Sequence, residues 1–183
     1  MKNNNRIRII GGEWRGRYIT FPPFSNLRPT PNRVRETLFN WLGQTLRETT
    51  CVDLFAGSGA LGFEAASRGA KKVVLVEKNS SICRSLRENI IKLNAEQVEI
   101  RNADALVFLN NGNKKFDLVF LDPPFKSEFH ANIWQGIKRL VRPGSLIYVE
   151  SNRRHDWPSV FKKKRFSQAG QVFYSLLEFE SKS

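Results

Sequence analysis

Cysteine and histidine are scarce in this 183-residue sequence, which contains two of each. Cys51 and Cys83 are far apart along the chain, and neither has a second Cys or a His at the spacing of a metal ligand. We therefore expect no disulfide framework and no metal site. His130 and His155 have no recognisable partners, and we assign them no role.

Long apolar runs are missing as well. No segment approaches the length of a membrane span, and the first residues are polar and lack the hydrophobic core of a signal peptide. We therefore expect a cytoplasmic protein without a membrane partner. The length and the hydrophobic fraction of 40% allow one principal domain with a sizeable core, but not two full-sized domains.

Acidic residues are outnumbered, because 30 Lys and Arg face 17 Asp and Glu and give a net charge of +13. Residues 1–50 carry nine basic and three acidic side chains (+6), residues 51–150 carry 14 and 11 (+3), and residues 151–183 carry seven and three (+4). The alternative is a highly charged surface that only keeps the protein soluble. The concentration of charge at the two ends favours a polyanionic partner, with nucleic acid first among the candidates.

Four short runs rich in Val, Leu, Ile and Phe predict strands that are buried on both faces, at residues 51–56, 73–77, 116–122 and 146–150. Helical patterns lie between them, at residues 60–68, at 80–93 with Ser80 as a cap candidate, and from about 129 to 141 before Pro143-Gly144. A further strand is expected at 98–101. The alternation of strands and helices predicts a parallel α/β sheet.

The two ends of the chain depart from this alternation. Residues 1–24 predict a β-hairpin with strands at 7–10 and 18–21 and a turn through Gly11-Gly12, and a helix is expected at 33–42. A basic run at 162–165 precedes a final strand pair containing residues 172–174 and 176–179. We therefore divide the chain into a hairpin extension, residues 1–24, and a main domain, residues 25–183.

Each of the four apolar strands carries a carboxylate at or near its C-terminal end: Asp53, Glu77, Asp122 and Glu150. Ligands of open parallel sheets bind at this edge. One such acid can simply cap the next helix or turn, which is the interpretation we favour for Glu150. The four together indicate a polar ligand lying across the sheet.

The loop after the first of these strands contains Gly57, Gly59 and Gly62 in a G-x-G-x-x-G pattern at the start of a helix. The pattern by itself is weak and equally typical of nicotinamide dinucleotide sites. Asp53, four residues before Gly57, is poorly placed beside a pyrophosphate but suits an α-ammonium group. The loop therefore favours S-adenosylmethionine, which has an ammonium group and no phosphate.

Two further acids fit the same cofactor. Glu77, at the end of the second strand, is placed to accept hydrogen bonds from both ribose hydroxyls. Asp104 has two possible roles that can coexist: it can accept from the adenine amino group, or it can cap the helix expected at 105–109.

The tetrapeptide Asp122-Pro123-Pro124-Phe125 follows the fourth strand. Its two prolines give a stiff loop that exposes acceptors and an aromatic ring. An exocyclic base amine needs both: Asp122 and the Pro123 carbonyl can pull the nitrogen toward tetrahedral geometry, and Phe125 can stack on the base. The alternative, a rigid turn with Phe125 in the core, does not account for the Asp53 loop at the same edge of the sheet.

The sequence resembles the RsmD family of bacterial 16S rRNA guanine-N2 methyltransferases over nearly its whole length. The stretches that carry the resemblance are residues 7–17, 27–30, 33–42, 55–61, 122–125, 148–151 and 170–172. The first three are the most specific to the family.

The resemblance implies a Rossmann-like methyltransferase sheet of seven mostly parallel strands with the last strand antiparallel, and an N-terminal hairpin. It also implies S-adenosyl-L-methionine as cofactor, 16S rRNA or the small ribosomal subunit as partner, and contacts of Thr30 and Arg33 with the methionine end of the cofactor. We expect a monomer. Asn32 stands where the family is expected to have Asp, which puts a carboxylate role there in doubt.

On the hairpin, Trp14 lies beside Arg15 and Arg17, a combination that suits base stacking and phosphate contact. Alternatively, Trp14 pins the hairpin to the domain.

Three rival functions remain. An adenine-N6 methyltransferase acting on DNA or RNA would use the same Pro-Pro loop, and only the family-like N-terminal third favours guanine. A binding module without activity would not need Asp53, Glu77 and Asp122. A nicotinamide-dependent dehydrogenase would explain the glycines but neither the Pro-Pro loop nor the net charge.

Overall fold

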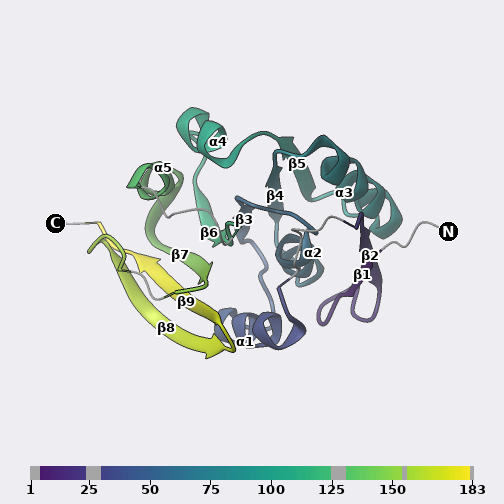
Figure 1. Cartoon of the computed structure of the whole chain (residues 1–183), viewed down its shortest axis with the longest axis horizontal. Coiled ribbons are helices and arrows are strands. Elements are labelled where there is room, and N and C mark those ends of the chain that lie inside the picture. The colour runs from purple at the N-terminus through teal and green to yellow at the C-terminus, as the bar shows by residue number, and fades with distance from the viewer. Residues whose placement is uncertain (1–4, 24–29, 125–130, 154–155, 182–183) are drawn as a thin grey trace.

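The computed structural model describes residues 5–23, 30–124, 131–153 and 156–181. Figure 1 shows a central sheet between two groups of helices, with a small hairpin on one side. The elements in chain order are β1 (Asn5–Arg8), β2 (Tyr18–Phe21), α1 (Asn32–Leu42), β3 (Thr50–Asp53), α2 (Ala60–Ser67), β4 (Lys72–Glu77), α3 (Ser80–Leu93), β5 (Val98–Asn102), α4 (Ala105–Asn111), β6 (Phe116–Leu121), α5 (Ala131–Leu140), β7 (Val141–Ser151), β8 (Phe161–Ala169) and β9 (Val172–Phe179).

The main sheet has seven strands in the order β5-β4-β3-β6-β7-β9-β8. The first five of this order are parallel to one another, and β9 is antiparallel to both β7 and β8. The predicted Rossmann-like sheet with an antiparallel last strand is therefore confirmed. The chain moves outward from β3 to β5 and then returns to place β6 beside β3, so the topological switch point lies between β3 and β6. Ligands of open α/β sheets bind at this point, outside the carboxyl ends of the strands.

Alternate residues of the central strands enter two separate cores, which explains why their sequences are apolar on both faces. One core holds side chains of α1, α2, α3 and the hairpin, and the other holds side chains of α4 and α5. On β3, for example, Cys51 belongs to the first core and Val52 to the second. None of the helices in the described part of the chain is long and apolar enough to cross a membrane.

The predicted antiparallel hairpin is confirmed, with Ile7 opposite Ile19, but its first strand covers Asn5–Arg8 and not residues 7–10. The expected turn through Gly11-Gly12 is part of a longer loop formed by residues 9–17, in which residues 13–16 make the turn. Within this loop, the N–H of Glu13 donates to the Ser67 carbonyl at 2.7 Å and the N–H of Trp14 donates to Ser67 Oγ at 2.9 Å. The loop is therefore fixed to the end of α2.

Three local predictions need correction. Asn79, not Ser80, caps α3, because its side chain accepts from the N–H groups of Ser81 and Ile82. Residues 172–174 and 176–179 belong to one strand, β9, whose partner β8 contains the basic run 162–165. Pro143-Gly144 lies inside β7, at a register shift against β6, and α5 already ends at Leu140.

Candidate active site

The glycine loop leads from β3 into α2 along a tight backbone path. Gly59 has φ +79°, and a Cβ at this position would lie 2.7 Å from the Phe63 ring, so a side chain is excluded by both conformation and space. The N–H of Gly57 donates to Glu77 Oε2 at 3.0 Å. This bond joins the loop to the end of β4.

Asp53 is a buried carboxylate at the end of β3, with 2% of its surface exposed. The N–H of Phe55 donates to it at 3.3 Å, and none of the Lys or Arg side chains among the described residues pairs with it. Burial raises the pKa of Asp53 to about 7, the Phe55 N–H opposes this rise, and the negative charge of Glu77 adds to it. A buried anion without a cation is unfavourable, so this position suits a positively charged ligand group.

Glu77 and Asp104 are held by backbone N–H groups. Glu77 accepts from Gly57 and, through Oε1, from the N–H of Asn79 at 2.8 Å, which leaves further lone pairs on both oxygens. Asp104 caps α4, with its Oδ1 accepting from the N–H of Leu106 at 2.8 Å, so the cap predicted from the sequence is confirmed.

Asp122 follows β6, and the hydroxyl of Thr30 donates to its Oδ2 at 3.3 Å. Thr30 is itself buried, just before α1. The pKa of Asp122 is raised well above its ordinary value by burial first, then by the negative charges of Glu150 and Asp53, while the Thr30 hydroxyl opposes the rise.

Glu150 belongs to the same carboxylate cluster, a role that the sequence analysis did not favour. It is 3% exposed, and the Tyr148 hydroxyl donates to its Oε2 at 2.8 Å. Burial raises its pKa, and the Tyr148 bond opposes the rise. The interpretation of Glu150 as a turn cap is therefore wrong. Its signal in the sequence was a Tyr two residues earlier, on the same face of the strand.

Strand register brings three of these carboxylates together. Asp53 pairs with Phe120 across β3 and β6, and Leu121 pairs with Val149 across β6 and β7, so Asp122 and Glu150 follow side by side. All three acids alternate onto the face of the sheet that is covered by α1, α2 and α3. The pKa of each of the three is raised, so this end of the sheet holds protons that a bound cationic group would displace. Among the described residues, no cluster of three or more His, Cys, Asp or Glu side chains could hold a metal ion.

The remaining expected site residues fall into three groups. Pro123 is buried and Pro124 exposed, whereas Phe125 lies outside the described residues. Arg33 is exposed on the first turn of α1. On the hairpin, Arg15 and Arg17 are exposed, and Arg17 Nη2 donates to the carbonyl of Lys92 at 2.6 Å.

Trp14 is buried in the first core, with 3% of its surface exposed. Its ring is therefore not available for stacking on a base, and that expectation is corrected. The alternative, in which Trp14 pins the hairpin to the domain, agrees with its burial and with the bond from its N–H to Ser67.

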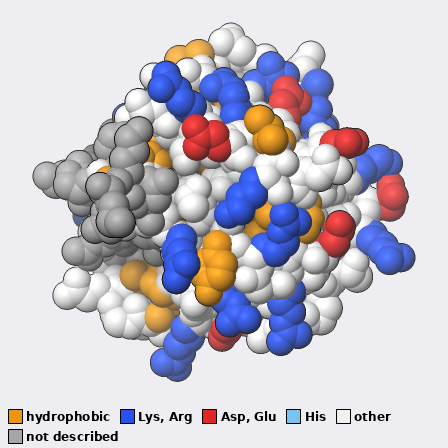
Figure 2. Space-filling view, turned by 90° about the vertical axis from the view of Figure 1, so that its right-hand side faces the viewer, with side chains coloured by type: hydrophobic (Ala, Val, Ile, Leu, Met, Phe, Trp, Pro, Cys, Tyr) orange, Lys and Arg blue, Asp and Glu red, His pale blue; other side chains and the backbone are white. Residues whose placement is uncertain are grey.

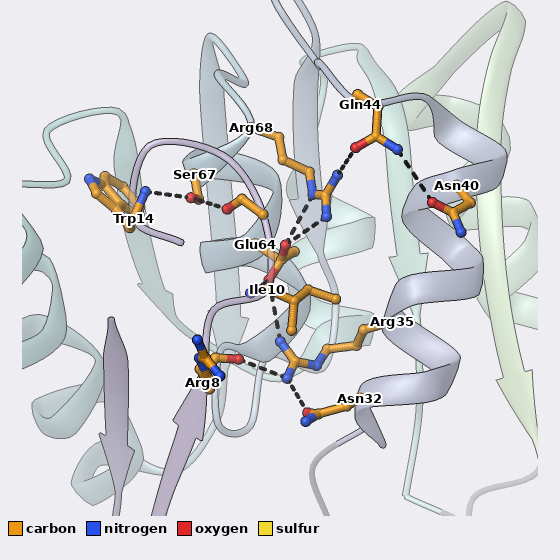
Figure 3. Close-up of polar contacts among 11 residues, drawn as sticks. Arg8, Ile10, Trp14, Asn32, Arg35, Asn40, Gln44, Glu64, Ser67 and Arg68 are labelled. Atoms are coloured by element: carbon orange, nitrogen blue, oxygen red, sulfur yellow. Dashed lines mark hydrogen bonds and ion pairs between the residues drawn. The ribbon is translucent and has the colours of Figure 1, made fainter. Parts of the chain in front are cut away.

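A buried ionic cluster beneath the hairpin was not expected from the sequence. Figure 3 shows Glu64 of α2 between Arg35 of α1 and Arg68. Glu64 accepts from Arg35 Nη1 at 3.3 Å, from Arg68 Nε at 3.0 Å, and from the N–H of Ile10 at 2.9 Å. The sequence contains one indication of this cluster: Glu64 is the single acidic residue in a segment, residues 60–67, that is otherwise made of apolar and small residues.

The same cluster gives a structural role to Asn32. Arg35 Nη2 donates to the Asn32 side chain at 2.6 Å and to the Arg8 carbonyl at 2.9 Å (Figure 3). The hairpin, α1 and α2 are thus joined through one set of charged groups.

Comparison with known proteins gives consistent matches over most of the chain. Residues 7–178 match the family described as Conserved hypothetical protein 95. The chain is 41% identical over 184 residues to the ribosomal RNA small subunit methyltransferase D of Escherichia coli strain K12, which covers 97% of this chain and 92% of that protein. The protein of the same name from Haemophilus influenzae is 45% identical over 157 residues, 80% of this chain and 79% of its own length.

Solved structures agree with this relationship. The structure of yhhF from Escherichia coli matches with a TM-score of 0.87 and 39% identity over 97% of this chain and 100% of that chain. An RNA methyltransferase from Salinibacter ruber, solved in complex with S-adenosyl-L-homocysteine, shares the fold with a TM-score of 0.65 and 16% identity over 85% of this chain and 96% of its own.

Proposed function

The chain belongs to the RsmD family, the family described as Conserved hypothetical protein 95, and on this premise we propose that it transfers a methyl group from S-adenosylmethionine to the exocyclic N2 amine of a guanine in bacterial 16S rRNA. The single observation that carries the proposal is the position of Asp122. It lies beside Asp53 at the switch point, held by Thr30 and followed by Pro123. An enzyme with this substrate acts in the bacterial cytoplasm.

The residues at this edge of the sheet fit the proposed cofactor. Asp53 is a buried acid that pairs with no Lys or Arg in the described part of the chain, and its carboxylate would bind the α-ammonium group. Glu77 has free acceptor capacity for the ribose hydroxyls, and the backbone of Gly57 and Gly59 allows close approach. Bound there, the cofactor supplies an electrophilic methyl group on a positively charged sulfur.

Three further assignments belong to the same proposal. The free oxygen of Asp104 would accept from the adenine amino group, in addition to its cap. Arg33 would contact the methionine carboxylate from the first turn of α1. Thr30 would contact the methionine end from beside Asp122, whose carboxylate accepts a hydrogen bond from its hydroxyl.

Asp122 and the Pro123 carbonyl would act on the base amine, whose lone pair is delocalised into the ring. Each would accept a hydrogen bond from one N–H of the amine, which favours tetrahedral geometry at the nitrogen. The Asp122 carboxylate would then take the proton that the methylated nitrogen releases. Phe125, outside the described residues, would stack on the base.

Residues 1–24 would serve as an RNA-binding extension of the domain formed by residues 25–183, through the exposed Arg15 and Arg17. Phosphate contacts by such side chains give affinity that falls with salt concentration. The network around Glu64 would hold this extension in a fixed position relative to the cofactor helix α1.

The test is incubation of the purified protein with labelled S-adenosylmethionine and either small subunits or 16S rRNA from cells that lack the enzyme, followed by nucleoside analysis. Labelled N2-methylguanosine is the expected product. Labelled N6-methyladenosine would show that the target base is adenine, the alternative, and not guanine. The absence of labelled nucleoside from both substrates would overturn the proposal.

A further inference from the structure

A basic surface with exposed apolar groups lies outside the site, on the outer face of the hairpin. Tyr18 of β2 is 38% exposed, and the guanidinium of Arg6 on β1 lies 4.8 Å from the centre of its ring. The two side chains form a cation–π pair that presents a planar group to the solvent. They are also on the opposite face of the hairpin from the buried Ile7 and Ile19.

Helix α3 extends this surface, because polar contacts fix it against β2. Ser85 Oγ and Asn89 Nδ2 both donate to the Thr20 carbonyl, at 2.9 and 2.7 Å. One turn further on, Lys92 Nζ donates to the Tyr18 carbonyl at 2.7 Å. The ammonium group of Lys92 is therefore held beside the Tyr18–Arg6 pair.

The exposed flank of α3 next to these contacts adds Arg84, Glu88 and Ile91, of which Ile91 is 80% exposed. Figure 2 faces this side of the molecule and shows Lys and Arg side chains around exposed hydrophobic groups. The flank begins close to the site, because α3 starts directly after Glu77 and its cap Asn79. Helix α3 thus leads from the proposed cofactor edge at its first turn to Lys92 and the Tyr18–Arg6 pair at its last turn.

We propose that this surface, formed by Arg6, Tyr18, Arg84, Ile91 and Lys92, binds a single-stranded segment of the substrate RNA next to the target nucleotide. The Tyr18–Arg6 pair offers a plane on which a base can stack, and unpaired RNA bases stack on aromatic and guanidinium groups. Lys92 and Arg84 contact the phosphates along α3. Tyr18 thereby supplies the stacking role that the buried Trp14 does not fill.

The basic run on β8 provides a matched comparison. Lys162–Arg165 lie at the far edge of the sheet, on the other side of the molecule from the hairpin (Figure 1). Lys164 pairs with Glu178 at 2.6 Å, and Lys163 Nζ lies 5.8 Å from the centre of the Phe166 ring. A segment bound at the hairpin surface does not extend to these residues.

The inference rests on the proposed function, and three variants test it: Tyr18→Leu, Tyr18→Phe, and the double change Arg6→Gln with Lys92→Gln. The control is Lys162→Gln with Lys163→Gln, which removes the same charge from β8. Affinity for 16S rRNA from cells lacking the enzyme is measured by filter binding at several salt concentrations. Cofactor affinity is measured by calorimetry and folding by thermal unfolding.

We expect Tyr18→Leu to weaken RNA binding by about 5- to 100-fold, the range of one lost stacking contact, and Tyr18→Phe to keep most of the affinity. The Arg6 and Lys92 double variant should lower the slope of log affinity against log salt by about 0.7, because the phosphate contact of Lys92 with a single strand is lost. The β8 control and all cofactor affinities should stay at the wild-type value. Unchanged RNA affinity in the folded hairpin variants, or an equal loss in the β8 control, would overturn the inference.

The two proposals fail in different ways. If the wild-type protein forms N2-methylguanosine and the hairpin variants bind RNA normally, only the assignment of this surface to RNA is wrong. An acidic protein would then be the partner to test for this surface. If the wild-type protein methylates neither small subunits nor 16S rRNA, the proposed function is wrong as well.

Discussion

At the scale of single residues, Asp53 makes the stability of the free protein depend on pH. Its pKa is about 7 in the folded protein, against an ordinary value of 3.8, so the folded state keeps a proton that the unfolded chain has released. The stabilisation is complete below about pH 4 and is lost as the pH rises through 7. Without cofactor, the free energy of unfolding of the wild type relative to Asp53→Asn should therefore fall between pH 4 and 8, on the order of 2 to 4 kcal/mol.

Urea unfolding of both proteins at several pH values measures this difference. Because the two side chains have nearly the same shape, titrating groups away from the site cancel in the comparison, whereas Asp122, whose pKa the charge of Asp53 raises, contributes to the difference. If the difference in free energy of unfolding between the two proteins stays constant from pH 4 to 8, burial does not raise the pKa of Asp53.

Glu150 should control the pH at which Asp122 becomes an effective proton acceptor. Its negative charge raises the pKa of Asp122, and the acceptor must be ionised. In Glu150→Gln that charge is absent, so the rise of the methylation rate with pH should move to lower pH. Single-turnover rates from pH 5 to 9 at saturating cofactor measure the shift, with the exposed Glu96→Gln as control. Identical pH profiles for the wild type and Glu150→Gln would show that the charge of Glu150 does not influence the proton acceptor of the reaction.

At the scale of elements, the Glu64 cluster joins the hairpin to α1 and α2. Removing Glu64 leaves the guanidinium groups of Arg35 and Arg68 buried without their anion, which costs about 3 to 5 kcal/mol. We expect Glu64→Ala to lower the free energy of unfolding by that amount in denaturant titration. Glu48→Ala, which breaks only the exposed pair with Lys71, should leave stability nearly unchanged. Equal stability of the two variants would mean that the buried cluster contributes nothing to folding.

Some elements could be predicted from the sequence and others could not, for physical reasons. The central strands are apolar on both faces because two cores enclose them, and this composition is visible locally. The path of residues 9–17 depends instead on contacts with Ser67, more than fifty positions away. A Trp followed by two nearby Arg residues looks the same in the sequence whether its ring is exposed or, as for Trp14, buried.

The candidate site divides in the same way. Asp53, Glu77 and Asp122 follow predicted strands, so the rule that ligands bind at the carboxyl edge was enough to group them. The bonds from Thr30 to Asp122 and from Tyr148 to Glu150 depend on side-chain directions at the ends of neighbouring elements. Such bonds require the strand register, which the sequence alone does not provide.

At the scale of the whole molecule, the positive charge and the anionic site have separate places. The carboxylates gather at one edge of the sheet under α1, whereas exposed cations cover the hairpin and α3 (Figure 2). RNA can thus be attracted by the surface without meeting the carboxylates until a base amine enters the site. In this account the hairpin and α3 carry part of the net charge of +13, and β8 at the far edge of the sheet carries another part.

The central claim is that Asp122 acts on the target amine and does not bind the cofactor. The most direct measurement is the single-turnover rate of N2-methylguanosine formation by a folded Asp122→Asn protein, with calorimetric cofactor affinity measured on the same preparation. The account predicts a rate lower by on the order of a hundredfold or more, with cofactor affinity close to that of the wild type because Asp53 and Glu77 are intact. A folded Asp122→Asn protein that binds S-adenosylmethionine and forms N2-methylguanosine at nearly the wild-type rate would contradict it.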